Sequence, residues 1–181
     1  TGAANTALGF NTMLNNTTAA NNVAVGAYAL DANTEGAGNT AVGTSSLGAN
    51  TTALANVGVG FDALKLNTTA SYNTAVGAYS MDATTTGCKN TAVGFNSLGA
   101  NTTGDDNVAI GQNSLRCATT ADANTAVGIC SLFKTTTGAK NVGIGTCALI
   151  CNLTGEENTA VGFNALRETT TGSANVAVGQ D

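Results

Sequence analysis

The sequence is a tandem repeat with a period of 17 residues, kept without an insertion or deletion along the chain. Each unit begins with Asn, followed by Thr or Val, by Ala or Gly, by an aliphatic residue and by Gly. Positions are counted below from this Asn as position 1. A fixed period of this length requires a fold that repeats with the sequence. The eleven Asn residues are Asn5, Asn22, Asn39, Asn56, Asn73, Asn90, Asn107, Asn124, Asn141, Asn158 and Asn175.

The length and composition of the unit favour a parallel β-solenoid, or β-roll. Gly, Asn and Thr recur throughout the unit and are poor helix formers, and helical repeats need about 33 residues or more. Seventeen residues suit one coil, stacked on the next at the spacing of about 4.8 Å found between neighbouring strands. Residues 1–181 then form one all-β domain of about 10.6 coils. The absence of Pro agrees, because Pro would remove a ladder hydrogen bond.

Within a coil, we expect short strands near positions 2–4, 7–9 and 12–14. The aliphatic residue at position 4 and the Leu or Met at position 9 are placed in the interior, as two continuous columns. Position 3 is only Ala or Gly and position 5 only Gly, so this part of the coil admits nothing bulky. Either the chain turns there with positive φ, or another backbone lies close against it.

The column of Asn residues at position 1 predicts a ladder in which side-chain amides bond to those of the coils above and below. Positions 6 and 7 exchange volume, as in Phe61-Asp62 and Ala78-Tyr79. These rings either pack at a corner of the coil or form an apolar stripe that meets a neighbouring chain.

Acidic residues gather at one corner of neighbouring coils. Asp105, Asp106 and Asp122 are a candidate Ca²⁺ site, since Ca²⁺ prefers oxygen ligands. Ion pairs between coils, Lys89 with Asp106 and Lys140 with Glu157, explain the same pattern without a metal.

The five cysteines are too few for a disulfide scaffold. Only Cys130 and Cys147 share a position on adjacent coils, about 4.8 Å apart, and are therefore a possible disulfide. We expect most of the thiols to be free.

Asn-x-Thr sequences fall mostly at position 12, which we expect at an exposed corner. Asn50, Asn67 and Asn101 are examples.

Composition argues against several classes of function. The chain has no His, and only 9% of its residues are charged, so the usual catalytic triads lack their base. Its net charge is −5, without the basic patch of a nucleic-acid-binding protein. No apolar run is long enough for a membrane helix. We therefore expect no catalysis, no cofactor, no nucleic-acid partner and no membrane insertion.

The units Asn-Thr-Ala-Val-Gly-x-x-Ala-Leu, with Asn-Thr-Thr-Gly between them, resemble repeats of tail-fibre-like proteins of phages and large viruses; residues 90–104 are typical. They are also similar to the head repeats of trimeric autotransporter adhesins (YadA-like), which build a left-handed parallel β-roll in a trimer. The resemblance implies an elongated scaffold on a virion or cell surface, and a host-surface glycan or receptor as a partner. It transfers no site residues.

Three functions remain. The first is a structural segment of an extracellular or virion-surface fibre, filament or adhesin, which associates with itself head to tail or as a trimer. Head-to-tail stacking is expected because the repeat runs from Thr1 to Asp181 without a terminal cap. The second is ice binding through the Thr columns at positions 13 and 14. The third is a polysaccharide hydrolase using paired carboxylates, which the scarcity of acids disfavours.

Overall fold

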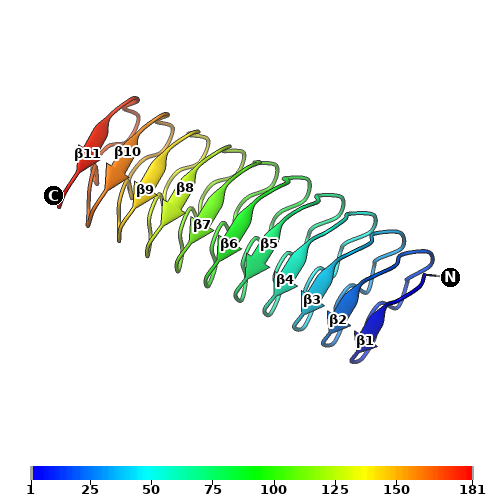
Figure 1. Ribbon diagram of the computed structural model, residues 1–181. Helices are drawn as coiled ribbons and strands as arrows, with labels where there is room; N and C mark the ends of the chain where they lie inside the picture. Colours follow the sequence, from blue (N-terminus) through cyan, green and yellow to red (C-terminus); the bar gives the residue numbers. More distant parts are fainter. Residues whose placement is uncertain (1, 181) are drawn as a thin grey trace.

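The computed structural model describes residues 2–180, and Thr1 and Asp181 lie outside the described residues. Eleven strands of three residues form one parallel sheet in chain order, along one side of a rod (Figure 1). This arrangement confirms the predicted all-β solenoid of 17-residue coils. The strands are β1 (Thr6–Leu8), β2 (Val23–Val25), β3 (Thr40–Val42), β4 (Val57–Val59), β5 (Thr74–Val76), β6 (Thr91–Val93), β7 (Val108–Ile110), β8 (Thr125–Val127), β9 (Val142–Ile144), β10 (Thr159–Val161) and β11 (Val176–Val178).

The sheet is in register along its whole length, because each residue pairs with its equivalent one coil later. In the middle of the rod, Thr91 pairs with Val108, and Ala92 pairs with Ala109. Consecutive strands therefore present the same repeat position at the same height, and every position becomes a column parallel to the rod axis.

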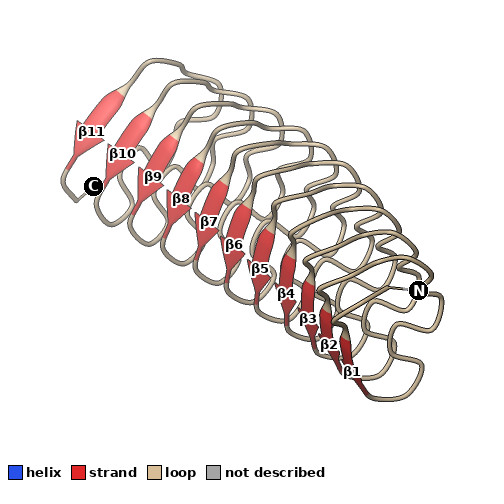
Figure 2. Cartoon of the chain, turned by 45° about the vertical axis from the view of Figure 1, so that its right-hand side comes forward, coloured by secondary structure: helices blue, strands red, loops and turns tan. Residues whose placement is uncertain are grey.

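Each coil contains one strand, so the expected strands at positions 7–9 and 12–14 are wrong. The rest of the coil consists of turns and bends on the other sides of the rod (Figure 2). At positions 7–9 the reason is left-handed backbone, with φ of 55° at Asn96 and 52° at Leu98, whereas positions 13 and 14, such as Thr102 and Thr103, form a bend. Left-handed residues interrupt the extended conformation that a strand needs.

The turns are nevertheless stacked by backbone hydrogen bonds between coils. The Leu98 amide donates to the Ser114 carbonyl at 3.0 Å, and the Thr102 amide donates to the Thr119 carbonyl at 2.9 Å. The backbone of neighbouring coils is thus connected all the way round, not only in the sheet.

The interior is lined by position 3 and position 9, and the placement of position 4 inside is wrong. Ala92 at position 3 is fully buried, whereas Val93 at position 4 is 36% exposed. Successive strand residues face opposite sides, and only a methyl group fits on the inner side. A Cβ built on Gly58, also at position 3, would lie 2.6 Å from Ser46 Oγ. The predicted Leu column at position 9 is inside, with Leu98 fully buried.

Gly at position 5 satisfies both of the conditions expected for it. Gly94 has φ of +134°, and a Cβ added there would lie 2.6 Å from the carbonyl oxygen of Gly111. Positive φ and the close approach of the next coil each exclude a side chain at this position.

A matched pair of substitutions tests the orientation of the strand. We expect Ala92→Asp to destabilise the rod by more than about 3 kcal/mol, because it places an unpaired charge in the interior. Val93→Asp should cost about 1 kcal/mol or less, since the side chain enters solvent and loses only strand propensity. Thermal unfolding followed by circular dichroism measures both, and equal losses in the two variants would contradict the assignment.

Candidate functional site

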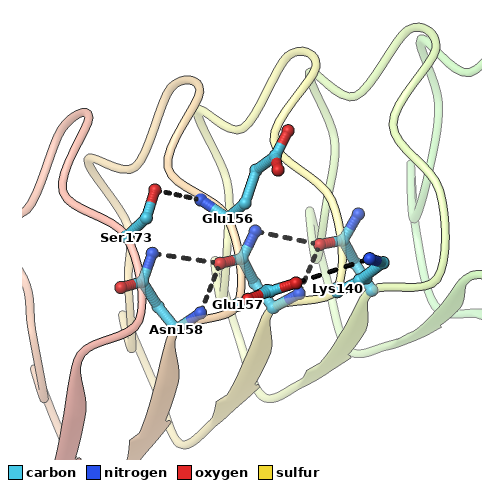
Figure 3. A network of polar contacts seen from close by, with 7 residues as sticks. Lys140, Glu156, Glu157, Asn158 and Ser173 are labelled. Atoms are coloured by element: carbon cyan, nitrogen blue, oxygen red, sulfur yellow. Dashed lines mark hydrogen bonds and ion pairs between the residues drawn. The ribbon is translucent and has the colours of Figure 1, made fainter.

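The Asn side chains at position 1 form a hydrogen-bonded ladder inside the rod. The Asn90 Nδ2 donates to the Gly104 carbonyl at 2.8 Å, and its Oδ1 accepts from the backbone amide of Asn107 at 2.9 Å. The Asn107 Nδ2 also reaches this Oδ1, at 3.1 Å. Figure 3 shows the same ladder around Asn158. Because each amide serves both its own coil and the next, this column holds the coils in register.

A second interior amide column lies at position 12, so the expectation that this position is exposed is wrong. Asn50 and Asn67 are fully buried. The Asn50 Nδ2 donates to Asn33 Oδ1 at 2.9 Å, and the Asn67 Nδ2 donates to Asn50 Oδ1 at 3.1 Å. Burial removes these side chains from modification in the folded rod, although their sequences match an acceptor motif.

The Thr columns at positions 13 and 14 have different roles. At position 13 the hydroxyl bonds to the next coil: Thr85 Oγ1 donates to the Thr102 carbonyl at 3.1 Å, and Thr102 Oγ1 donates to the Thr119 carbonyl at 3.0 Å. At position 14 the Thr side chains are exposed, as at Thr86 and Thr103. This corner therefore offers one outward Thr column rather than two.

The two amide columns should differ in their tolerance of substitution. Asn90→Ala leaves the buried backbone amide of Asn107 without a partner and removes one of the two donors to the Gly104 carbonyl, and we expect a loss of at least about 2 kcal/mol. Asn101→Thr should change stability by less than about 1 kcal/mol, because Thr84 and Thr135 occupy the same position in other coils. Thermal unfolding measures both variants. A larger loss for Asn101→Thr would contradict the primary role of position 1.

At the acidic corner, carboxylates bond to backbone amides of the preceding coil. Asp105 Oδ1 accepts from the Cys88 amide at 2.6 Å, and Asp122 Oδ1 accepts from the Asp105 amide at 2.8 Å. Ser173 Oγ does the same for the Glu156 amide at 3.0 Å (Figure 3). The structure therefore gives Asp105 and Asp122 a place in a structural column. Within residues 2–180, no group of three or more His, Cys, Asp or Glu residues could hold a metal ion.

Of the two ion pairs expected here, one is formed. Lys140 Nζ lies 3.4 Å from Glu157 Oε1, with both side chains exposed, whereas Lys89 and Asp106 make no salt bridge in the described part of the chain. Exposed pairs of this kind contribute little to stability.

The possible Cys130–Cys147 disulfide is not formed, and the five cysteines are all free thiols. The two side chains stand on adjacent coils in equivalent backbone conformations, with φ of 54° and 59°. Equivalent conformations keep stacked side chains parallel, whereas a disulfide needs them to turn toward each other. Burial, with a smaller contribution from Cys147, raises the pKa of the Cys130 thiol, and a hydrogen bond from Asn113 opposes this change.

We expect all five thiols to be titrated after unfolding without reductant. In the folded rod, Cys130 should be alkylated slowly at pH 8, because its raised pKa lowers the fraction of the reactive thiolate. Rates of modification measured by mass spectrometry across pH give this pKa. Cys147→Ser should lower it by removing the neighbouring thiolate, and an unchanged pH profile in that variant would contradict the coupling.

The outer side of the sheet is a long uncharged surface, rich in aliphatic side chains, that the sequence did not reveal. Positions 2 and 4 face outward from every strand and carry only Thr, Val, Ile or Leu. Val76 and Ile110 at position 4 are 36% and 40% exposed. We call the outward residues of positions 2, 4 and 6 the sheet face. In the sequence, larger residues at positions 2 and 4 flank the small Ala or Gly at position 3. This alternation could have identified the sheet face.

Aromatic rings at position 6 of the sheet face contact rings at the adjoining position 7 across coils. The Phe61 and Tyr79 ring centroids lie 5.3 Å apart, and those of Tyr79 and Phe95 lie 5.9 Å apart, both edge to face. The rings thus form an exposed cluster, which is the arrangement expected of the apolar stripe.

Two shallow hollows lie along the column of position 10. The first is lined by Tyr28, Asp31, Ser45, Gly48, Ala49, Lys65 and Leu66 and has a volume of about 320 Å³. The second is lined by Tyr79, Asp82, Asn96, Gly99, Ala100 and Arg116 and has a volume of about 270 Å³. These two sites are the first hollow and the second hollow.

The geometry defines a parallel β-solenoid whose repeated polar side chains are used mainly to join its coils. Neither a family model, nor a curated protein, nor a solved structure matches this chain. Residues 2–180 contain no helix of the length and hydrophobicity needed to cross a membrane.

Proposed function

We propose that the chain is a structural rod, a non-catalytic repeat segment of an extracellular or virion-surface fibre, filament or adhesin. The observation that carries this proposal is the continuity of the interior columns. The Asn ladder links each coil from Asn5 to Asn175 to the next. A rod joined by backbone and side-chain bonds in every coil resists bending and fraying in its middle.

The sheet face supports lateral association of the rod with copies of itself. At about 4.8 Å per coil and 3.3 Å per residue, positions 2 to 6 of the eleven coils cover about 650 Å², on which aliphatic and aromatic side chains alternate with uncharged Thr and Gln. Soluble monomers rarely expose contiguous apolar patches larger than a few hundred Å². Two copies facing each other would bury about 1,300 Å², which exceeds the roughly 1,000 Å² of a specific interface. The partner in this proposal is therefore a second copy of the chain.

Axial stacking is a further part of the same proposal. Within residues 2–180, β1 and β11 each have one edge that pairs with no other strand. An open edge of this kind recruits another strand, which a neighbouring segment or copy would supply in a fibre.

Ice binding is the second candidate, and the sheet face favours it more than the Thr corner does. Positions 2 and 4 form two parallel columns, with Thr or Val in the first and aliphatic residues in the second. They give a regular, uncharged array with spacings of about 4.8 Å and about 6.6 Å. An ice-binding face must stay free, however, so the two functions make opposite predictions for association.

Charge placed on the sheet face tests the proposal. We expect the parent chain to sediment as an oligomer and to show no thermal hysteresis. The double variant Val76→Lys/Ile110→Lys should weaken association at least tenfold, because apposed faces would bring unpaired charges together. Analytical ultracentrifugation over a range of concentrations measures the change.

The matched control places the same charges in the same two coils, at the exposed Thr corner. Thr86→Lys/Thr120→Lys should associate as the parent does. A parent chain that remains a 17.7 kDa monomer at high concentration contradicts lateral association. Thermal hysteresis that is lost in Val76→Lys/Ile110→Lys and kept in the control would establish ice binding instead.

A further inference from the structure

The two hollows are copies of one another, displaced by 51 residues, which is three coils. Tyr28, Asp31 and Gly48 of the first hollow correspond to Tyr79, Asp82 and Gly99 of the second. The cation is also repeated, as Lys65 in the first hollow and as Arg116 in the second. A three-coil arrangement of surface side chains therefore occurs twice in succession on the 17-residue repeat.

Each hollow exists because position 10 is Gly in its middle coil. Along this column, Asp31, Gly48 and Lys65 follow one another in successive coils, as do Asp82, Gly99 and Arg116 in the second hollow. The carboxylate and the cation thus stand in the same column, two coils and about 10 Å apart, and the glycine leaves the space between them open. The tyrosine ring forms a wall at the coil that carries the carboxylate.

The side chains of a hollow combine an aromatic surface with acceptors and donors of hydrogen bonds. Burial raises the pKa of Asp82 above its ordinary value, with backbone hydrogen bonds opposing this effect, and burial also raises the pKa of Asp31. A partly desolvated carboxylate gains from hydroxyl donors. Lys65 Nζ is 3.0 Å from Asp62 Oδ2, and the ammonium group has further N–H donors for a ligand.

The charges of a hollow indicate an uncharged ligand. One carboxylate and one cation line each hollow, Asp62 adds a second carboxylate beside Lys65 of the first, and the chain as a whole carries −5. An anionic ligand would be repelled by the chain and by the carboxylate. A neutral ring with several hydroxyl groups can place an apolar face against tyrosine while it bonds to both charged groups.

We propose that the two hollows are equivalent binding sites for a neutral polysaccharide, each holding one sugar ring against Tyr28 or Tyr79. The sites lie about 14 Å apart on a rigid rod, at three coil spacings. Two equal sites at a fixed distance match a ligand that is itself periodic, and simultaneous occupation raises the apparent affinity. This inference deepens the adhesin role and rests on the proposed function for the rod that holds the sites at this distance.

Filling the hollows tests the proposal without straining the backbone. Gly48 and Gly99 lack positive φ, and a Cβ at Gly99 would meet only the Asn96 side-chain oxygen, which can rotate away. Ile150 stands at the position equivalent to Gly99, 51 residues later. Gly48→Ile/Gly99→Ile should therefore fold and lose binding. We expect the full chain to be retarded in electrophoresis through gels containing at least one of dextran, mannan and laminarin, and not through gels containing alginate. Each single substitution should weaken the apparent affinity at least about tenfold by removing bivalency.

The matched control is Thr52→Ile/Thr103→Ile, which adds the same side chains to the same two coils at the exposed Thr corner. It should be retarded as the parent is. Tyr28→Ala/Tyr79→Ala should lose retardation, since it removes the rings. Unchanged retardation of Gly48→Ile/Gly99→Ile, no retardation by any of the three neutral polymers, or retardation by alginate alone would overturn the proposal. Sedimentation of the same samples reports the rod and its association separately, so failure of the proposed function would be recognised independently.

Discussion

In-register stacking of 17-residue coils is the constraint on which every other feature of this protein depends. Each residue lies beside its own equivalent in the next coil, so a group that bonds well to a copy of itself can be repeated indefinitely. The amide of Asn90 donates and accepts at once, and Asn therefore forms the continuous interior column. A single inserted residue would move every later side chain out of its column.

Stacking also explains why the rod tolerates a backbone that is unusual elsewhere. Left-handed φ values recur at positions 7 and 9, including non-glycine residues such as Asn96 and Leu98. This conformation costs an ordinary residue roughly 1–2 kcal/mol. Hydrogen bonds from the Leu98 amide and from its equivalents to the next coil offset that cost. The turns gain their stability from neighbouring coils rather than from their own sequence.

The proposed functions use the sheet face and the hollows, which lie on the outside of the rod, away from the interior columns of Asn and Leu. The sheet face follows from strand alternation, whereas the hollows depend on which residues happen to occupy position 10. Tyr79 joins the two regions, because it contacts Phe61 and Phe95 of the sheet face and also lines the second hollow. Since the interior requires little variation, side chains of the outer columns are free to differ from coil to coil and to form recognition sites.

The sequence by itself determined the solenoid, the coil length and the interior columns of Asn and Leu, because a strict period forces equivalent residues together. It did not determine which strand residue faces inward: Val93 is the more hydrophobic, yet Ala92 is buried because the interior beside the strand has room only for a methyl group. Nor did it show that Asn50 is interior. Only the tertiary structure decided these points, since the left-handed turns at positions 7, 9 and 17 set the path of the chain and therefore the direction of each side chain.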